Sequence, residues 1–274
     1  MIDQTGKTAW ITGASSGIGE ALAKAFVSNG GNAVLSGRNV SELDRVASDS
    51  GAPERCLILP FDTMDFGGLS TNVEAATAFR SGIDILVNNA GISQRSLAID
   101  TAFEVYERIV GVDLLAPIAL TQALLPHLIA RGAGQLVMIS SVAGKAGIPL
   151  RTAYCAAKHG LVGYADALRS EVAGQSVGVL VVAPGSVRTN VSRNALNADG
   201  SVRGTSDKAI DNGIDPDQVA RLIWEAVANG TREMVIAEGM EANIPVLRAQ
   251  DPEKLFDMVE AMVAAGYATK MAAD

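Results

Sequence analysis

Seven short apolar segments alternate with segments of helical periodicity, and this alternation constrains the fold more than any other feature of the chain. The apolar segments lie near residues 7–12, 33–36, 56–61, 84–88, 134–139, 178–183 and 233–236. Between the third and fourth, apolar residues at 73, 76 and 79 recur at helical spacing. Strands that alternate with helices form parallel sheets covered on both faces. The pattern therefore predicts an α/β fold, a doubly wound parallel sheet of about seven strands.

The 274 residues contain no linker or internal repeat that would divide them, so we expect one domain over residues 1–274. Pro117 falls inside a helical stretch and should kink it or mark an irregular turn. The polar segment 188–215 is long for a simple connection, and we expect a mobile substrate lid there, with a disordered loop as the alternative. Helical spacing from Leu255 onward predicts a helical extension over about 240–274, packed on the domain or on a second subunit.

A glycine-rich turn follows the first apolar segment. The sequence Gly13-Ala14-Ser15-Ser16-Gly17-Ile18-Gly19 comes directly after it, and helical periodicity begins there. Glycine lets the backbone approach a phosphate, and the unpaired N–H groups of a helix N-terminus point at it. The spacing is GxxxGxG rather than the general GxGxxG. We expect a pyrophosphate site here, with a plain tight turn as the alternative.

Small and polar residues also follow two later strands. Asn88-Asn89-Ala90-Gly91 ends the fourth apolar segment, and Pro184-Gly185-Ser186-Val187-Arg188-Thr189 ends the sixth. The carboxyl ends of parallel strands form the edge at which an open α/β sheet binds its ligand. We therefore expect both segments to line one binding site.

Tyr154 and Lys158 are four residues apart and so share one helix face. A free phenol has a pKa of about 10, and a nearby cation lowers it toward neutrality. Ser141, thirteen residues before Tyr154, adds a hydroxyl that can hold a substrate oxygen. The three side chains together can move a proton to or from a substrate oxygen, but a YxxxK pair taken alone also occurs often by chance.

Five motifs now stand in order: TGxxxGIG at 12–19, NNAG at 88–91, Ser141, YxxxK at 154–158 and PGxVxT at 184–189. In this order and spacing they resemble the short-chain dehydrogenase/reductase family of the single-domain type, over roughly residues 5–240. The resemblance implies a Rossmann fold. It also implies an oxidoreductase that interconverts a ketone or aldehyde and an alcohol by direct hydride transfer with a nicotinamide cofactor.

The family's roles transfer to matching positions. By this resemblance Tyr154 is the general acid in reduction and the base in oxidation, Lys158 lowers its pKa and binds the nicotinamide ribose, and Ser141 orients the substrate oxygen. The cofactor-binding positions that the resemblance implies are Gly13, Ser15, Ser16, Gly17, Ile18, Gly19, Arg38, Asp62, Thr63, Asn89, Ala90, Gly91, Tyr154, Lys158, Pro184, Gly185, Val187 and Thr189. Asp62 and Thr63 match the positions at the adenine, and the last three match the wall that holds the carboxamide.

The end of the second apolar segment favours NADP(H) over NAD(H). Gly37 stands where NAD-binding members carry an acidic residue for the ribose 2′-OH, and Arg38 follows it. The missing carboxylate and the added guanidinium fit a 2′-phosphate. Arg38 can also be an ordinary surface arginine, so the missing carboxylate is the stronger argument.

Asp113 departs from the family pattern, because the family has an asparagine that completes a catalytic tetrad at this position. Asp113 can accept a hydrogen bond from water but has no side-chain amide to donate. If ionised, it would add negative charge near Lys158 and raise the pKa of the Tyr154 phenol. We expect an active enzyme whose oxidation rate is lowered or shifted in pH.

The net charge of −8 disfavours nucleic acid and anionic membranes as partners. We see no signal peptide and no apolar run near the roughly 20 residues of a membrane span, and expect a cytoplasmic protein. Cys56 and Cys155 are expected as buried reduced thiols. Two histidines and two scattered cysteines give no metal site.

Pocket candidates are Ser93, Gln94, Ile148, Leu150 and the lid, a mostly apolar set with little charge. They predict a small hydrophobic carbonyl or alcohol substrate. The resemblance implies a homo-dimer or homo-tetramer. Two alternatives stay open. One is an NAD(P)-binding sensor or assembly protein with little or no catalysis, which only Asp113 favours. The other is an enzyme for acyl-carrier or coenzyme A thioesters, for which the lid offers Arg188, Arg193 and Arg203.

Overall fold

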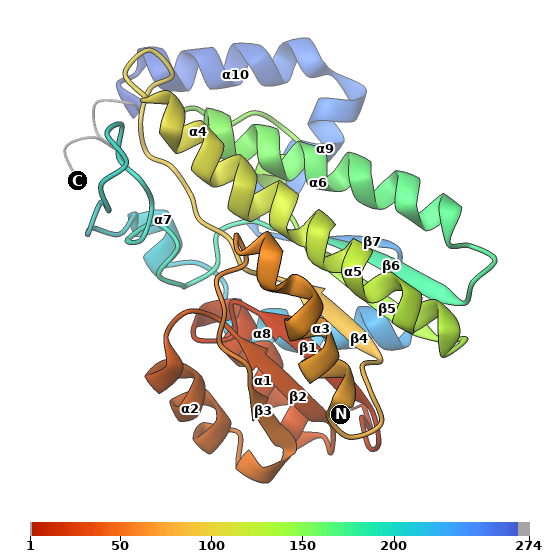
Figure 1. Cartoon of the computed structure of the whole chain (residues 1–274). Coiled ribbons are helices and arrows are strands. Elements are labelled where there is room, and N and C mark those ends of the chain that lie inside the picture. Colours follow the sequence, from red (N-terminus) through yellow and green to blue (C-terminus); the bar gives the residue numbers. More distant parts are fainter. Residues whose placement is uncertain (1, 268–274) are drawn as a thin grey trace.

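The computed structural model describes residues 2–267 of the chain, and within them seven strands form one parallel sheet (Figure 1). The order across the sheet is β3-β2-β1-β4-β5-β6-β7. The strands are β1 (Thr8–Thr12), β2 (Asn32–Ser36), β3 (Cys56–Ile58), β4 (Ile85–Asn88), β5 (Gly134–Ile139), β6 (Val177–Pro184) and β7 (Glu233–Ile236). This confirms the predicted doubly wound sheet, with β3 shorter than its apolar segment.

Helices cover both faces of the sheet (Figure 1). They are α1 (Gly17–Ser28), α2 (Val40–Asp49), α3 (Leu69–Ala78), α4 (Phe103–Val110), α5 (Ala116–Ala130), α6 (Thr152–Glu171), α7 (Lys208–Asp211), α8 (Pro216–Ala228), α9 (Gly239–Gln250) and α10 (Pro252–Ala264). Successive residues of β1 enter opposite cores: Ile11 packs with α1, α2 and α8, whereas Trp10 packs with α3, α5 and α6. This alternation follows from the twofold period of a strand.

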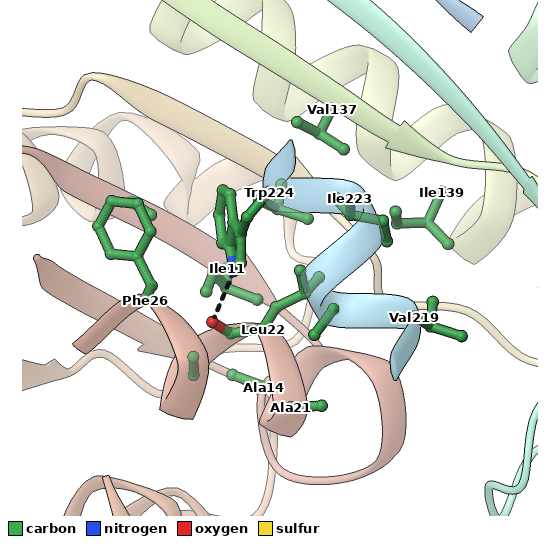
Figure 2. Packing of buried hydrophobic residues seen from close by; sticks show 14 of the residues in the cluster. Ile11, Ala14, Ala21, Leu22, Phe26, Val137, Ile139, Val219, Ile223 and Trp224 are labelled. Carbon is green, nitrogen blue, oxygen red and sulfur yellow. Dashed lines mark hydrogen bonds between the residues drawn. The ribbon is translucent and has the colours of Figure 1, made fainter. Parts of the chain in front are cut away.

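The core between α1 and α8 fixes the start of α1, where the glycine-rich turn ends (Figure 2). The Phe26 and Trp224 rings pack at 4.7 Å between centroids with their planes tilted by 45°, and the Trp224 indole N–H donates to the carbonyl of Leu22 at 3.1 Å. Each large aromatic side chain buried in this way contributes several kcal/mol on the usual area scale. The packing therefore holds the helix N-terminus against the edge of the sheet.

One prediction on membrane segments is wrong. Helices α4 and α5 join through a π-helical turn (Gly111–Leu115) into one helix of 28 residues, whose most apolar window has a mean hydropathy of 1.7, as a membrane span would. Asp113 and Pro117 divide the run in the sequence, but not in the structure. Within the domain, 44% of this window is buried, with Leu120, Leu124 and Leu128 in the core. The apolar side chains of this helix therefore include residues that form the core of the domain.

Pro117 explains the irregular turn that the sequence predicts at this place. Proline has no N–H to donate to the carbonyl four residues earlier, which belongs to Asp113, and its ring crowds that carbonyl. The helix therefore widens into the π turn, a feature often found at functional sites. Asp113 lies at the centre of this turn and is fully buried.

The 188–215 segment is folded rather than an unstructured loop. Leu196 forms isolated bridges with Gln94 and Val202, and Val187 forms one with Ile214. The short helix α7 lies within it. After β7 the predicted extension forms α9 and α10, which pack against each other, with Leu255 buried and Phe256 and Met262 partly exposed. Residues 268–274 of that prediction lie outside the described residues.

Candidate active site

All the motifs singled out in the sequence lie at one edge of the sheet. The glycine-rich turn follows β1, Gly37 follows β2, Asp62 comes after β3, and Ser141 comes after β5. NNAG begins with the last residue of β4, and PGxVxT begins with the last residue of β6. The neighbours β1 and β4 are where the strand order reverses, and this reversal opens a crevice for a ligand in sheets of this type.

The glycine-rich turn is packed against the strand-end segment of β4. Gly13 and Gly17 have φ values of +64° and +59°, and a Cβ on Gly19 would lie 2.2 Å from the carbonyl oxygen of Gly13. Only glycine fits these positions without strain. The side-chain amide of Asn89 donates to the carbonyls of Thr12 at 2.9 Å and Gly13 at 3.2 Å. The backbone is thus held close to the N-terminus of α1.

The N-terminus of α1 has no side-chain cap. Ser16 occupies the cap position in extended conformation, and its hydroxyl accepts no hydrogen bond from the backbone N–H groups of the helix. The first N–H groups of a helix need a partner, and anions supply one. The tight backbone and the uncapped helix end therefore fit the pyrophosphate of a dinucleotide, with Ser15, Ile18 and the three glycines around it.

The end of β2 leaves room where an acidic side chain would stand in NAD-binding relatives. A Cβ on Gly37 would meet only ordinary contacts, 3.5 Å from the Ser15 hydroxyl, so packing does not demand glycine there. Arg38 is exposed and makes no ion pair with any residue that the structure describes. Asp62 is exposed and accepts from the Met64 N–H at 2.9 Å, and Thr63 beside it is half-buried.

Tyr154 and Lys158 meet on α6 as their spacing predicts. The Lys158 ammonium lies 5.6 Å from the centroid of the Tyr154 ring and donates to the carbonyl of Ile139 at 3.0 Å. Ser141 follows Ile139 and Ser140 at the end of β5, and its hydroxyl donates to the carbonyl of Pro184 at 3.3 Å. The Tyr154 hydroxyl has no hydrogen-bond partner among the described residues. It is therefore available to a ligand.

Asp113 lies directly beside the lysine. Its Oδ2 is 3.1 Å from the Lys158 ammonium, an ion pair not aligned as a hydrogen bond, and its Oδ1 accepts from the Ile92 N–H at 2.8 Å. Burial raises the pKa of Asp113, and Lys158 offsets only part of this rise. Burial opposes the charge of Lys158, but Asp113 and Tyr154 outweigh it and raise the pKa of Lys158. The pair holds its protons more tightly than the separate groups would in water.

The segment after β6 presents unpaired backbone groups. Neither the N–H nor the carbonyl of Val187 finds a hydrogen-bond partner within residues 2–267, although the residue is buried. Buried backbone groups rarely stay unpaired, and a primary carboxamide supplies both a donor and an acceptor. Thr189 lies close to the glycine-rich turn, where its Cγ2 would be 2.9 Å from a Cβ on Gly17. These residues fit the nicotinamide end of the cofactor.

One of the pocket candidates, Gln94, anchors the start of α6. Gln94 is fully buried, and its side-chain oxygen accepts from the Ala153 N–H at 2.9 Å, in the first turn of the helix that carries Tyr154. Leu150 has a φ of +68°, which costs a non-glycine residue about 1–2 kcal/mol. Ser93 is buried and accepts from Arg95 at 2.8 Å. Ile148 is half-buried, and its backbone N–H donates to the sulfur of Cys155. Both cysteines are free thiols; Cys155 is buried and Cys56 is half-buried.

The expectation of little charge in this region is wrong. Arg95, with 3% of its side chain exposed, donates to Asp207 at 2.6 and 2.8 Å, and Arg151 reaches the same carboxylate at 3.4 Å. Arg203 pairs with its other oxygen. Burial opposes the charge of Asp207, but Arg95 and Arg203 outweigh it and lower its pKa. Burial and Arg151 lower the pKa of Arg95 to about 10. The sequence reasoning missed this buried cluster because its members come from three separate segments.

Comparison with known proteins finds the same family that the sequence motifs resemble. The family model described as short chain dehydrogenase matches residues 7–200. A "Dehydrogenase/reductase SDR family protein 7-like" from Anopheles gambiae is 41% identical over 238 residues, which cover 85% of this chain and 75% of that protein.

Solved structures share the fold. A short chain dehydrogenase/reductase from Burkholderia phymatum in complex with NAD aligns with a TM-score of 0.82 at 24% identity, over 93% of this chain and 97% of that one. A metagenomic short-chain oxidoreductase in complex with NADP aligns at 0.70 and 28% identity, over 85% and 97%.

Proposed function

The chain belongs to the short-chain dehydrogenase/reductase family, an NAD(P)-dependent oxidoreductase family, and from this premise we propose an NADP(H)-dependent enzyme for a hydrophobic carbonyl or alcohol. The observation that carries the proposal is the meeting of Tyr154, Lys158 and Ser141 at the edge of the sheet. The unpaired Tyr154 hydroxyl and the buried ammonium beside its ring are the groups that proton transfer at neutral pH requires.

In the proposed mechanism the substrate oxygen lies between the Ser141 and Tyr154 hydroxyls. Ser141 orients that oxygen, and Tyr154 donates a proton to it in reduction or removes one in oxidation. Lys158, held by the carbonyl of Ile139, stabilises the phenolate form of Tyr154 by its charge. When bound, the nicotinamide cofactor exchanges a hydride with the substrate carbon.

We propose NADP(H) as the preferred cofactor. Gly37 supplies no carboxylate for a ribose 2′-OH although a side chain would fit there, and Arg38 is exposed beside it. A free guanidinium can pair with a 2′-phosphate, which an acidic side chain would repel. The solved relatives include complexes with either cofactor, so the argument depends on these two residues.

The surroundings of Tyr154 support a hydrophobic substrate. Its ring packs on an apolar cluster that joins α4, α6 and the 188–215 segment through Val105, Ile109 and Leu196. Exposed Phe103 extends this apolar surface on α4, and exposed Val202 extends it on the 188–215 segment. A pocket whose walls are apolar around a few polar groups binds apolar molecules with one oriented polar group. We propose that the 188–215 segment covers such a substrate.

The test begins with titration of the purified protein with NADPH and then NADH, followed by nicotinamide fluorescence. We expect NADPH to bind at least tenfold more tightly. Turnover is then measured on a panel of hydrophobic ketones and secondary alcohols, with Tyr154→Phe as the control that binds cofactor and loses turnover. Equal or tighter NADH binding reverses the cofactor assignment. Cofactor binding without turnover on any substrate favours the non-catalytic sensor. The observation that supports this second candidate is the ion pair of Asp113 with Lys158.

A further inference from the structure

Helix α9 is fastened to the segment after β6 by one carboxylate. Glu241 Oε2 accepts from the backbone N–H of Ser186 at 2.6 Å, and Oε1 accepts from the Ser186 hydroxyl at 2.8 Å. Glu241 lies in the first turn of α9, where the helix dipole favours a negative charge. Hydrogen bonds to an ionised acceptor are about twice as strong as neutral ones. The contact thus joins two segments 55 residues apart with a charged, two-point attachment.

The glycine of the PGxVxT motif is required by this same carboxylate. A Cβ on Gly185 would lie 2.3 Å from Glu241 Oε2 and 2.9 Å from the Cβ of Ala237. A side chain at this position would require the Glu241 carboxylate to leave Ser186 and Ala237 to shift. Helix α9 also packs against the short turn Val142–Gly144 that follows Ser141. The start of α9 is therefore in contact with both the Pro184–Thr189 segment and the serine-bearing turn.

The attachment fixes the orientation of Val187. Glu241 takes the N–H of Ser186, and the carbonyl of Ser186 accepts from the Ile214 N–H at 3.0 Å. Both backbone groups of Ser186 are thus engaged, one toward α9 and one toward the 188–215 segment. Arg188 donates its N–H to the carbonyl of Ile214 at 3.0 Å. Val187 is held between these two anchors with its own backbone groups unpaired.

We propose that Glu241 is a positioning residue for the nicotinamide end of the cofactor. By holding Ser186, it keeps the N–H and carbonyl of Val187 turned toward the carboxamide, and it links the α9–α10 extension to cofactor binding. The inference rests on the proposed function, because it takes Val187 as the carboxamide partner. Glu241 acts through Ser186 and not by touching the cofactor, so its loss affects only ligands that carry the nicotinamide ring.

Two ligands that differ only in that ring test the inference by isothermal titration calorimetry. One is NADPH, and the other is 2′-phospho-ADP-ribose, which lacks the nicotinamide; NADH and ADP-ribose replace them if NADH binds more tightly. We expect Glu241→Ala to weaken dinucleotide binding about tenfold and to change binding of the nicotinamide-free ligand less than twofold. Glu238→Ala is the matched control, because Glu238 is an exposed carboxylate three residues earlier, at the cap of the same helix. It should change neither affinity.

Glu241→Gln and Ser186→Ala keep the test decisive if the alanine variant does not fold. Each removes part of the attachment, and each should weaken the dinucleotide selectively by a smaller factor. A purely structural role for Glu241 would weaken both ligands alike or neither, and either result overturns the inference. Wild-type protein that binds neither NADPH nor NADH would instead overturn the proposed function on which the inference rests. The two failures are therefore distinguishable.

Discussion

Two aspartates, Asp113 and Asp207, are buried beside basic side chains in this protein, and their surroundings differ in charge. Within residues 2–267, Asp113 has one cationic neighbour, the ammonium of Lys158 at 3.1 Å. Asp207 has the guanidinium groups of three arginines, which approach its two oxygens from three directions. Burial costs each carboxylate free energy, but only at Asp207 do the cations outweigh that cost, so its pKa falls while that of Asp113 rises.

The difference separates a group that can exchange a proton from one that is a permanent counter-ion. Asp113 and Lys158 together carry no excess charge, and either can be altered without stranding several like charges. Asp207 is the shared counter-ion of three buried or half-buried guanidiniums. They belong to Arg95, to Arg151 at the start of α6, and to Arg203 in the 188–215 segment. We therefore expect changes at Asp207 to act on stability, and changes at Asp113 or Lys158 to act on the reaction.

The largest effect is expected from Asp207→Ala. It leaves the guanidinium of Arg95 buried and facing another cation, and removal of one partner of a buried pair costs about 3–5 kcal/mol. Urea denaturation followed by circular dichroism measures this loss. Lys208→Gln, an exposed change at the next residue, is the control and should stay within about 0.5 kcal/mol. A loss at Asp207 as small as the control's would show that this carboxylate is not the counter-ion of the cluster.

Lys158→Met should lower kcat/KM roughly 100-fold to 1,000-fold in both directions, because the Tyr154 phenolate loses its nearby cation. The variant should unfold at a urea concentration closer to wild type than Asp207→Ala does, since Asp113 can take up a proton and become neutral. Steady-state kinetics and urea denaturation on the same preparation check both statements. An equal loss of stability in the two variants would remove the distinction between the two aspartates.

Asp113→Asn should raise the rate of alcohol oxidation near neutral pH by about tenfold, the factor that corresponds to about 1.4 kcal/mol. Loss of the carboxylate leaves the Lys158 charge fully effective at Tyr154, which favours the phenolate that acts as the base. The pH–rate profile for oxidation should accordingly move toward lower pH. A profile identical to that of wild type would remove Asp113 from the proton chemistry.

The smallest effect, and the sharpest comparison, is in the pH dependence of stability. Asp207 has a lowered pKa, so its stabilisation is present above about pH 4, the unfolded value, and is lost as pH falls through the folded pKa. Asp113 has a raised pKa, so its contribution is complete below about pH 4 and is lost as pH rises through the folded pKa. Urea midpoints are measured from pH 3 to 8 for wild type, Asp207→Asn and Asp113→Asn. Relative to wild type, Asp207→Asn should lose a rise of the midpoint with pH, and Asp113→Asn should lose a fall of the midpoint with pH. Slopes of one sign would contradict the assignment.

Local patterns in the sequence were sufficient to predict the sheet and most of the residues that the structure gathers in the candidate site. Each strand is a short apolar segment, and each motif except YxxxK lies where such a segment ends, so parallel pairing brings these motifs to one edge of the sheet. The spacing of Tyr154 and Lys158 depends only on helix geometry. Pro117 predicted an irregular turn because proline lacks one hydrogen-bond donor. The apolar run of α4 and α5 was missed because Asp113 and Pro117 interrupt it in the sequence.

What the tertiary structure alone decided are the contacts between segments with no regular period. Arg95 and Asp207 are 112 residues apart, Gln94 and Ala153 are 59 apart, and Ser186 and Glu241 are 55 apart. In the sequence none of these residues stands out, because solvent could hydrate each polar group equally well. Burial leaves each charge or amide to the partners that the packing of distant segments supplies. The sequence by itself therefore determined where the candidate site residues gather, and the tertiary structure decided which polar groups hold them in place.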